Sequence, residues 1–193
     1  DPALSVRVLS RASTEYLNSY FFGVVPLFVL MGLLVSVSDV GKETFEVARW
    51  ALRRIKGGLG VATVVANAIF ASITGSSIAS AAVFTKIATP EMLRHGYTPR
   101  FSVGVVAGSS VLGMLIPPSL LLIIYGFLAE ESVGRLFLAA VVPGIILAAA
   151  MSLAIVLMAI YWPSFIGGDE ISEADENIRS AAIKLFPILV LVV

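Results

Sequence analysis

The sequence contains no cysteine, a single histidine and few charged residues. Without Cys, disulfides and thiolate chemistry are excluded, and one His cannot make a His-rich metal site. Charged residues make up 13% of the 193 residues and hydrophobic residues 58%, whereas a soluble domain has roughly 25% charged and 45–50% apolar residues. The mean hydropathy of +0.97 comes from long apolar stretches, so we expect an all-α protein that crosses a membrane several times.

The formal net charge is zero, because the sequence has 13 basic and 13 acidic residues. No positive field is left to hold a phosphate backbone, so no nucleic-acid partner is expected. The chain starts at Asp1 without an initiator Met or a signal-peptide pattern, and it stops in an apolar run, 185–193, that is too short to span a bilayer. We therefore expect a fragment of a longer protein.

The first two segments differ in polarity. Residues 1–19 mix charged and apolar side chains, which suits an interfacial helix, whereas 20–38 carries no charge and is expected to be the first span. In 39–57, basic residues alternate with Trp50 and other apolar side chains, as in an amphipathic helix lying at the membrane surface.

The uncharged stretch 57–85 lies between two basic clusters. The positive-inside rule places both clusters in the cytoplasm, yet two full crossings need about 40 residues. A re-entrant hairpin fits this length, with arms at 58–73 and 78–92 and a tip at 74–77. The alternative is one long kinked span with the second basic cluster outside the cell.

The uncharged stretch 101–129 is interrupted by two adjacent prolines, Pro117 and Pro118. They remove two backbone donors and push Ile116 out of the helical region, so we expect a discontinuous helix. Residues 136–162 then predict an uninterrupted span, followed by an acidic loop at 167–180.

The hairpin tip and the helix break are the strongest candidate site. Unwound carbonyls and hydroxyls suit a hard cation such as sodium, and the N-termini of half-helices suit an anion. The sequence offers no carboxylate in either segment, which favours a monovalent ion over calcium or magnesium. The alternative is that these Gly, Ser and Ala residues only permit tight helix packing.

Other polar residues have simpler interpretations. Thr63, Asn67 and Thr74 form a stripe that would face protein or a cavity, with Asn67 as a hydrogen-bonding group between helices. Glu91 and the basic residues near it would reach the membrane surface or cap helices, and His95 would be solvated. An intramembrane hydrolase would need a His base near a serine, and a channel would need a filter loop or ring of charge; the sequence shows neither.

One long run carries a family resemblance: TGSSIASAAVFTKIATPEMLRHGYTPRFSVGVVAGSSVLGMLIPPSLLLIIYG. It resembles the first half of the large membrane subunit of tripartite ATP-independent periplasmic (TRAP) transporters, and the similarity extends from about residue 26 to about residue 163. The resemblance implies sodium-coupled uptake of an organic acid anion, such as a C4-dicarboxylate or sialic acid, across the bacterial inner membrane by an elevator mechanism. It also implies a small four-helix membrane subunit and a periplasmic substrate-binding protein as partners, and no cofactor besides the coupling ion. A stand-alone ion-coupled carboxylate carrier is the alternative.

The resemblance also implies roles for particular residues. It assigns sodium to Gly75, Ser76, Ser110, Gly113 and Pro117, and substrate to Ser76, Ser77, Ser80, Pro118 and Ser119. Residues 58–130 would be half of a transport domain, with 1–57 and 131–193 as scaffold. The sequence departs from many relatives at Ser80, where they have an acidic or other polar residue, and at Leu112-Gly113-Met114, where they have Ile-Gly-Pro before the double proline.

Overall fold

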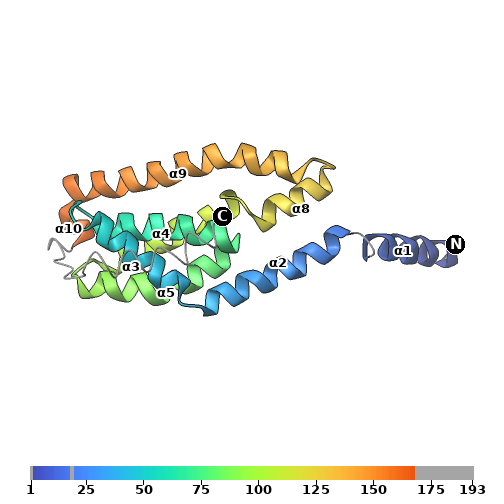
Figure 1. Ribbon diagram of the computed structural model, residues 1–193, viewed down its shortest axis with the longest axis horizontal. Coiled ribbons are helices and arrows are strands. Elements are labelled where there is room, and N and C mark those ends of the chain that lie inside the picture. Colours follow the sequence, from blue (N-terminus) through green and yellow to red (C-terminus); the bar gives the residue numbers. More distant parts are fainter. Residues whose placement is uncertain (1, 18–19, 168–193) are drawn as a thin grey trace.

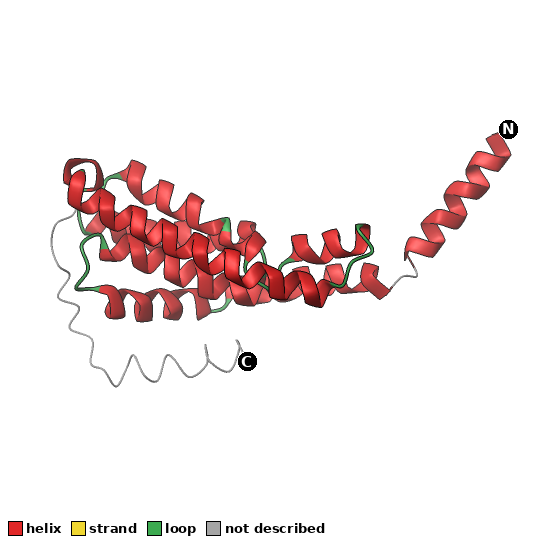
Figure 2. Cartoon of the chain, turned by 90° about the horizontal axis from the view of Figure 1, so that it is seen from above, coloured by secondary structure: helices red, strands yellow, loops and turns green. Residues whose placement is uncertain are grey.

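The computed structural model describes residues 2–17 and 20–167, and all ten elements in this part are helices. The prediction of an all-α protein is confirmed for these residues; the acidic loop expected at 167–180 lies outside them except for Gly167. Figure 1 labels most of the helices, and Figure 2 shows the N-terminal helix projecting away from the rest. The helices are α1 Pro2–Leu17, α2 Tyr20–Val37, α3 Val40–Leu52, α4 Gly58–Thr74, α5 Ser77–Arg94, α6 Pro99–Ser110, α7 Leu112–Leu115, α8 Leu120–Leu128, α9 Val133–Tyr161 and α10 Pro163–Ile166.

Within residues 2–17 and 20–167, one helix, α9, is long and apolar enough to cross a membrane alone. Two bent pairs are long and apolar enough only when each is taken together: α2 from Gly23 with α3, bent by 60°, and α6–α7 with α8, bent by 41°. The first expected span coincides with α2, and α9 begins a few residues before the predicted start of its span. It ends where predicted, because Trp162 closes the helix and Pro163 begins α10.

Helices α4 and α5 fold back on each other, as the hairpin prediction requires. The Thr63 hydroxyl of α4 lies 3.8 Å from the Met92 sulfur of α5, although each residue is far from the connecting turn. The two helices are therefore antiparallel and do not form one long kinked helix. The side of a membrane on which each basic cluster lies stays a prediction. The predicted tip at 74–77 contains the turn, since α4 ends at Thr74 and α5 begins at Ser77.

Helix α4 forms the centre of the core and contacts α3, α5, α6 and α9. Its small residues let neighbours approach closely, and Phe70 is fully buried against the ring of Phe84, with an edge-to-face centroid separation of 5.7 Å. Phe84 makes a similar contact with Phe45 of α3. In this way α3 is attached to the hairpin by one buried face, while its other face carries charged residues.

Two predictions about polar residues at this end of the hairpin need correction. Glu91 does not simply cap a helix or reach solvent, because its carboxylate forms an ion pair with Arg49 of α3. His95 is only one-quarter exposed, and its Nδ1 lies 2.8 Å from the Glu91 carbonyl oxygen. Both side chains are thus held by the packing of α3 and α5.

Candidate functional site

The hairpin tip is a two-residue interruption between α4 and α5. Gly75 has a φ of +56°, which favours glycine, and its N–H closes the end of α4 by donating to the Ala71 carbonyl at 2.8 Å. Ser76 is extended and caps α5, its hydroxyl oxygen accepting the N–H of Ala79 at 3.3 Å. One helix therefore ends and the next begins with only Gly75 and Ser76 between them.

The second interruption lies between α6 and α8. The short helix α7 ends at Leu115, the next residue Ile116 is extended, and the Pro117–Pro118 peptide bond is cis. Ser119 is also extended and precedes the first residue of α8. The discontinuous helix is therefore confirmed, and its break falls at the tandem prolines, as their missing N–H groups predict.

The tip and the break are in direct contact. A Cβ at Gly113 would lie only 2.8 Å from the Ser76 carbonyl carbon and from the Ser77 nitrogen, so the two backbones touch where Gly113 has no side chain. The N–H of Leu120 donates to the Gly75 carbonyl at 3.3 Å, and Gly75 itself lies against the Pro118 carbonyl. The structure thus brings together Gly75, Ser76, Ser77, Gly113 and Pro118 from the predicted site, with Ser119 next in the chain.

The site hydroxyls differ in how they are hydrogen-bonded. Ser110 donates to the Ala107 carbonyl at 2.8 Å, and Ser119 donates to the Met114 carbonyl at 2.7 Å. A hydroxyl that donates its hydrogen in this way keeps oxygen lone pairs that can face a cation. Ser80 is fully buried, and its hydroxyl has no hydrogen-bond partner among the described residues.

Ser80 lies one turn further along α5 than Ser76, whose carbonyl accepts the Ser80 N–H at 3.1 Å. Pro117 is half-buried at the break and precedes Pro118 in the chain. No group of three or more His, Cys, Asp or Glu residues lies together within 2–17 and 20–167. The described part of the chain therefore contains no cluster of the kind that holds a divalent metal.

Helix α2 supplies contacts to the tip that the sequence did not predict. The ring of Phe28 covers Gly75, and Gly32 of α2 lies close to the Thr74 carbonyl, so that a Cβ at Gly32 would be 3.3 Å from that oxygen. Nothing in the local sequence indicates which face of α2 meets the tip. The contact from Leu120 could have been expected, because the first N–H groups of a helix lack partners within it.

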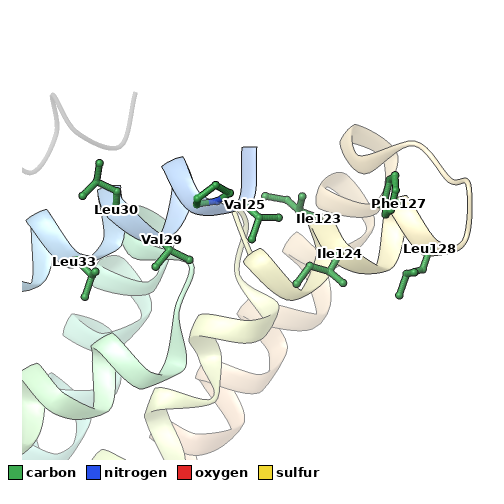
Figure 3. Close-up of a pocket in the computed structure, with 9 residues that line it drawn as sticks. Val25, Val29, Leu30, Leu33, Ile123, Ile124, Phe127 and Leu128 are labelled. Atoms are coloured by element: carbon green, nitrogen blue, oxygen red, sulfur yellow. The ribbon is translucent and has the colours of Figure 1, made fainter. Parts of the chain in front are cut away.

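A groove of about 610 Å³ opens beside the tip, between α2 and α5. Thr74 and Ser76 line one part of it, and Asp39, Lys42 and Lys86 line another. A second pocket, of about 770 Å³, lies between α2 and α8 (Figure 3). Its lining residues are all apolar, so it offers nothing to an anion.

The polar stripe on α4 is buried in the core and connects the hairpin to α6. Thr63, Asn67 and Thr74 are fully buried, which confirms that the stripe faces protein. The Asn67 amide Nδ2 donates to the Ser109 hydroxyl of α6 at 2.5 Å, as expected for a hydrogen-bonding group between helices. This bond ties the hairpin to the broken helix below their contact at the tip.

Comparison with known proteins gives consistent matches. Residues 3–193 match the family described as "Tripartite ATP-independent periplasmic transporter, DctM component". The C4-dicarboxylate TRAP transporter large permease protein of Pseudomonas aeruginosa is 37% identical over 155 residues, which cover 80% of this chain and 36% of that protein. The sialic acid TRAP transporter permease protein of Haemophilus influenzae is 32% identical over 145 residues, or 73% of this chain and 24% of that protein.

The isethionate TRAP transporter permease protein of Oleidesulfovibrio alaskensis is 28% identical over 179 residues, covering 92% of this chain and 27% of that protein. The chain thus spans about a third or less of the length of these relatives. They are permeases and not enzymes, which confirms the prediction that this chain is not a hydrolase. The chain belongs to the DctM component family of tripartite ATP-independent periplasmic transporters.

Proposed function

We propose that this chain is part of the large permease of a sodium-coupled transporter that takes up an organic acid anion across the bacterial inner membrane. The relatives are named for C4-dicarboxylate, sialic acid and isethionate, all of which are acid anions at neutral pH. We expect a carboxylate such as a C4-dicarboxylate or sialic acid to be the substrate here.

The observation that carries this proposal is the contact between the tip and the break. Two helix interruptions placed against each other gather backbone groups that regular helices would satisfy internally, and such groups bind ions in membrane transporters. We assign sodium to Gly75, Ser76, Ser110, Gly113 and Pro117, and substrate to Ser76, Ser77, Ser80, Pro118 and Ser119. A bound sodium ion offsets the charge of the anion, so each favours binding of the other.

The chain reversal at Gly75 and Ser76 supports a re-entrant hairpin. Irregular backbone at membrane depth needs cover from protein or a water-filled cavity, and α2 and the helix break cover this tip. In the elevator mechanism that we propose, 58–130 moves as half of the transport domain, with 1–57 and 131–193 as scaffold. Both α3 and α9 pack along α4, and Arg49 of α3 pairs with Glu91 of α5. A crosslink from α3 or α9 to α4 that leaves transport intact would show instead that the crosslinked helix moves with the hairpin.

The partners we propose are the small four-helix membrane subunit and a periplasmic substrate-binding protein. Large apolar side chains are exposed along α2, α8 and α9, which suits contact with lipid or with another membrane subunit. The alternative function is a stand-alone ion-coupled carboxylate carrier that needs neither partner.

Reconstitution of the full-length permease in vesicles tests the proposal. We expect uptake of a C4-dicarboxylate or sialic acid only with an inward sodium gradient, the small subunit and the binding protein. Uptake with the permease alone would favour the stand-alone carrier. If neither anion moves under a sodium gradient with all three components, and other carboxylates also fail, the proposed function is wrong.

A further inference from the structure

The groove between α2 and α5 runs from the candidate site toward basic residues. At one end, Thr74 and Ser76 line it at the tip, and at the other Lys42 and Lys86 do so. Lys86 lies ten positions after Ser76, the N-cap residue of α5. Ten residues of helix span about 15 Å. The opposite wall is α2, whose Gly32 lies close to the tip.

The mouth of this groove has a net positive charge. Lys42 and Lys86 are both exposed, and neither has an ion-pair partner within 2–17 and 20–167. Asp39 is the acidic residue that lines the groove, so the three charges sum to +1. Lysines at the rim of a cleft with apolar walls concentrate anions, because the field is focused by the low dielectric on either side.

The walls between the mouth and the tip are apolar, and they include Val29 and Leu33 of α2 and Ala82 and Val83 of α5. Ser36 and Ser38 of the α2 side also line the groove, but their hydroxyls donate to the Leu33 and Val35 carbonyls, each at 2.7 Å. An anion between these walls therefore meets no hydroxyl hydrogen that is free to bind it before the tip. This arrangement suits a passage better than a binding pocket, since passage requires weak binding along the way.

We propose that this groove is the passage by which the organic anion moves between the tip and the cytoplasm, with Lys42 and Lys86 attracting the anion at its mouth. The inference rests on the proposed function, since it takes the transported anion as the occupant. Beyond that function, the inference names the side of the site from which the anion leaves. It also names Lys42 and Lys86 as the residues whose positive charge attracts the anion there.

The test uses the full-length permease with its partners in oriented vesicles, loaded on the cytoplasmic side with increasing concentrations of the transported anion. We expect the double variant Lys42→Gln/Lys86→Gln to raise the half-saturating cytoplasmic concentration for exchange by about 3–10-fold at low ionic strength. The difference should shrink near 1 M salt, where the Debye length is about 3 Å. The sodium concentration for half-maximal exchange should stay unchanged, which a general structural defect would not allow.

Two further variants sharpen the comparison. Asp39→Asn removes the opposing charge without losing a helix cap, because the Asp39 side chain makes no capping bond, and it should lower the half-saturating concentration. Lys56→Gln removes the same charge from an exposed residue that does not line the groove, and it should have no effect.

The outcomes separate the inference from the function on which it rests. If the unaltered protein exchanges the anion but the double variant behaves like Lys56→Gln, the passage is wrong and the proposed function stands. A response to the fraction of phosphatidylglycerol in the vesicles, with no change in half-saturation, would make the groove a lipid site and would also overturn the passage. Failure of the unaltered protein to move any organic anion would overturn both.

Discussion

Arg49 of α3 and Glu91 of α5 form an ion pair between two helices, although 42 residues separate them in the sequence. Both side chains are about three-quarters buried, with exposed fractions of 27% and 20%. The pair lies at the end of the hairpin remote from the tip and fixes α3 to the returning arm.

We predict that Arg49→Met destabilises the protein by roughly 1–3 kcal/mol, because it leaves a partly buried carboxylate without its main partner. Thermal unfolding of the purified protein in detergent measures this. Arg94→Met is the control, since Arg94 is 79% exposed and lies 3.7 Å from the same carboxylate, and it should cost less than about 1 kcal/mol. Equal losses for the two variants would mean that the Arg49 contact has no special weight.

The contact between Gly113 and the tip predicts a second effect. Gly113→Ala places a methyl group against the backbone of Ser76 and Ser77, which should cost about 1–3 kcal/mol by overpacking and weaken sodium binding by separating tip and break. Gly104→Ala on α6 meets nothing within 4 Å and should stabilise the protein by about 0.5–1 kcal/mol, since Ala favours the helix over Gly. If both variants have the same stability and the same sodium dependence, the close contact between Gly113 and the tip does not matter for folding or for sodium binding, and the prediction is wrong.

The sodium assignment predicts that Ser76→Ala and Ser110→Ala each raise the sodium concentration for half-maximal uptake. Loss of one oxygen ligand worth about 1–3 kcal/mol corresponds to a rise of roughly 5-fold to more than 100-fold. The matched control is Ser72→Ala, because Ser72 makes a similar bond within α4, donating to the Ile69 carbonyl at 2.6 Å, and lies outside the assigned ligands. Unchanged sodium dependence in both site variants would exclude the assignment and leave these serines with a packing role.

Asn67 and Ser109 predict a coupled effect on stability. Ser109→Ala should cost about 1–3 kcal/mol, because it leaves the buried Asn67 amide without its acceptor. Adding Asn67→Leu removes the unpaired group at similar volume and should recover part of that loss. A double-mutant cycle in detergent measures the coupling, and a value near zero would show that the bond contributes little.

The antiparallel hairpin predicts the membrane sidedness of two positions. The start of α4, next to Lys56, and the end of α5, at Arg94, lie at the same end of the hairpin. The positive-inside rule places this basic end in the cytoplasm. Single-cysteine variants Lys56→Cys and Arg94→Cys should therefore both react with a membrane-impermeant reagent from the cytoplasmic side. The described chain has no native Cys to interfere. Labelling from opposite sides would contradict the re-entrant arrangement.

The sequence alone was sufficient for the features that depend on local backbone chemistry. Gly75 accepts a left-handed conformation, Ser76 caps a helix, and Pro117 and Pro118 cannot donate to one, so the tip and the break were predictable at these residues. The length of the uncharged stretch between two basic clusters predicted the hairpin, because an extended apolar segment must match the thickness of a membrane.

Only the tertiary structure decided which surfaces meet. It placed Gly113 against Ser76, turned Phe28 onto Gly75 and paired Arg49 with Glu91. Such contacts depend on the rotation of each helix about its axis and on how side chains from distant segments fill the space between them. Local propensity and hydropathy carry no information about that rotation when a helix is apolar on every side, as α2 is, because no stripe marks the face that packs against the tip.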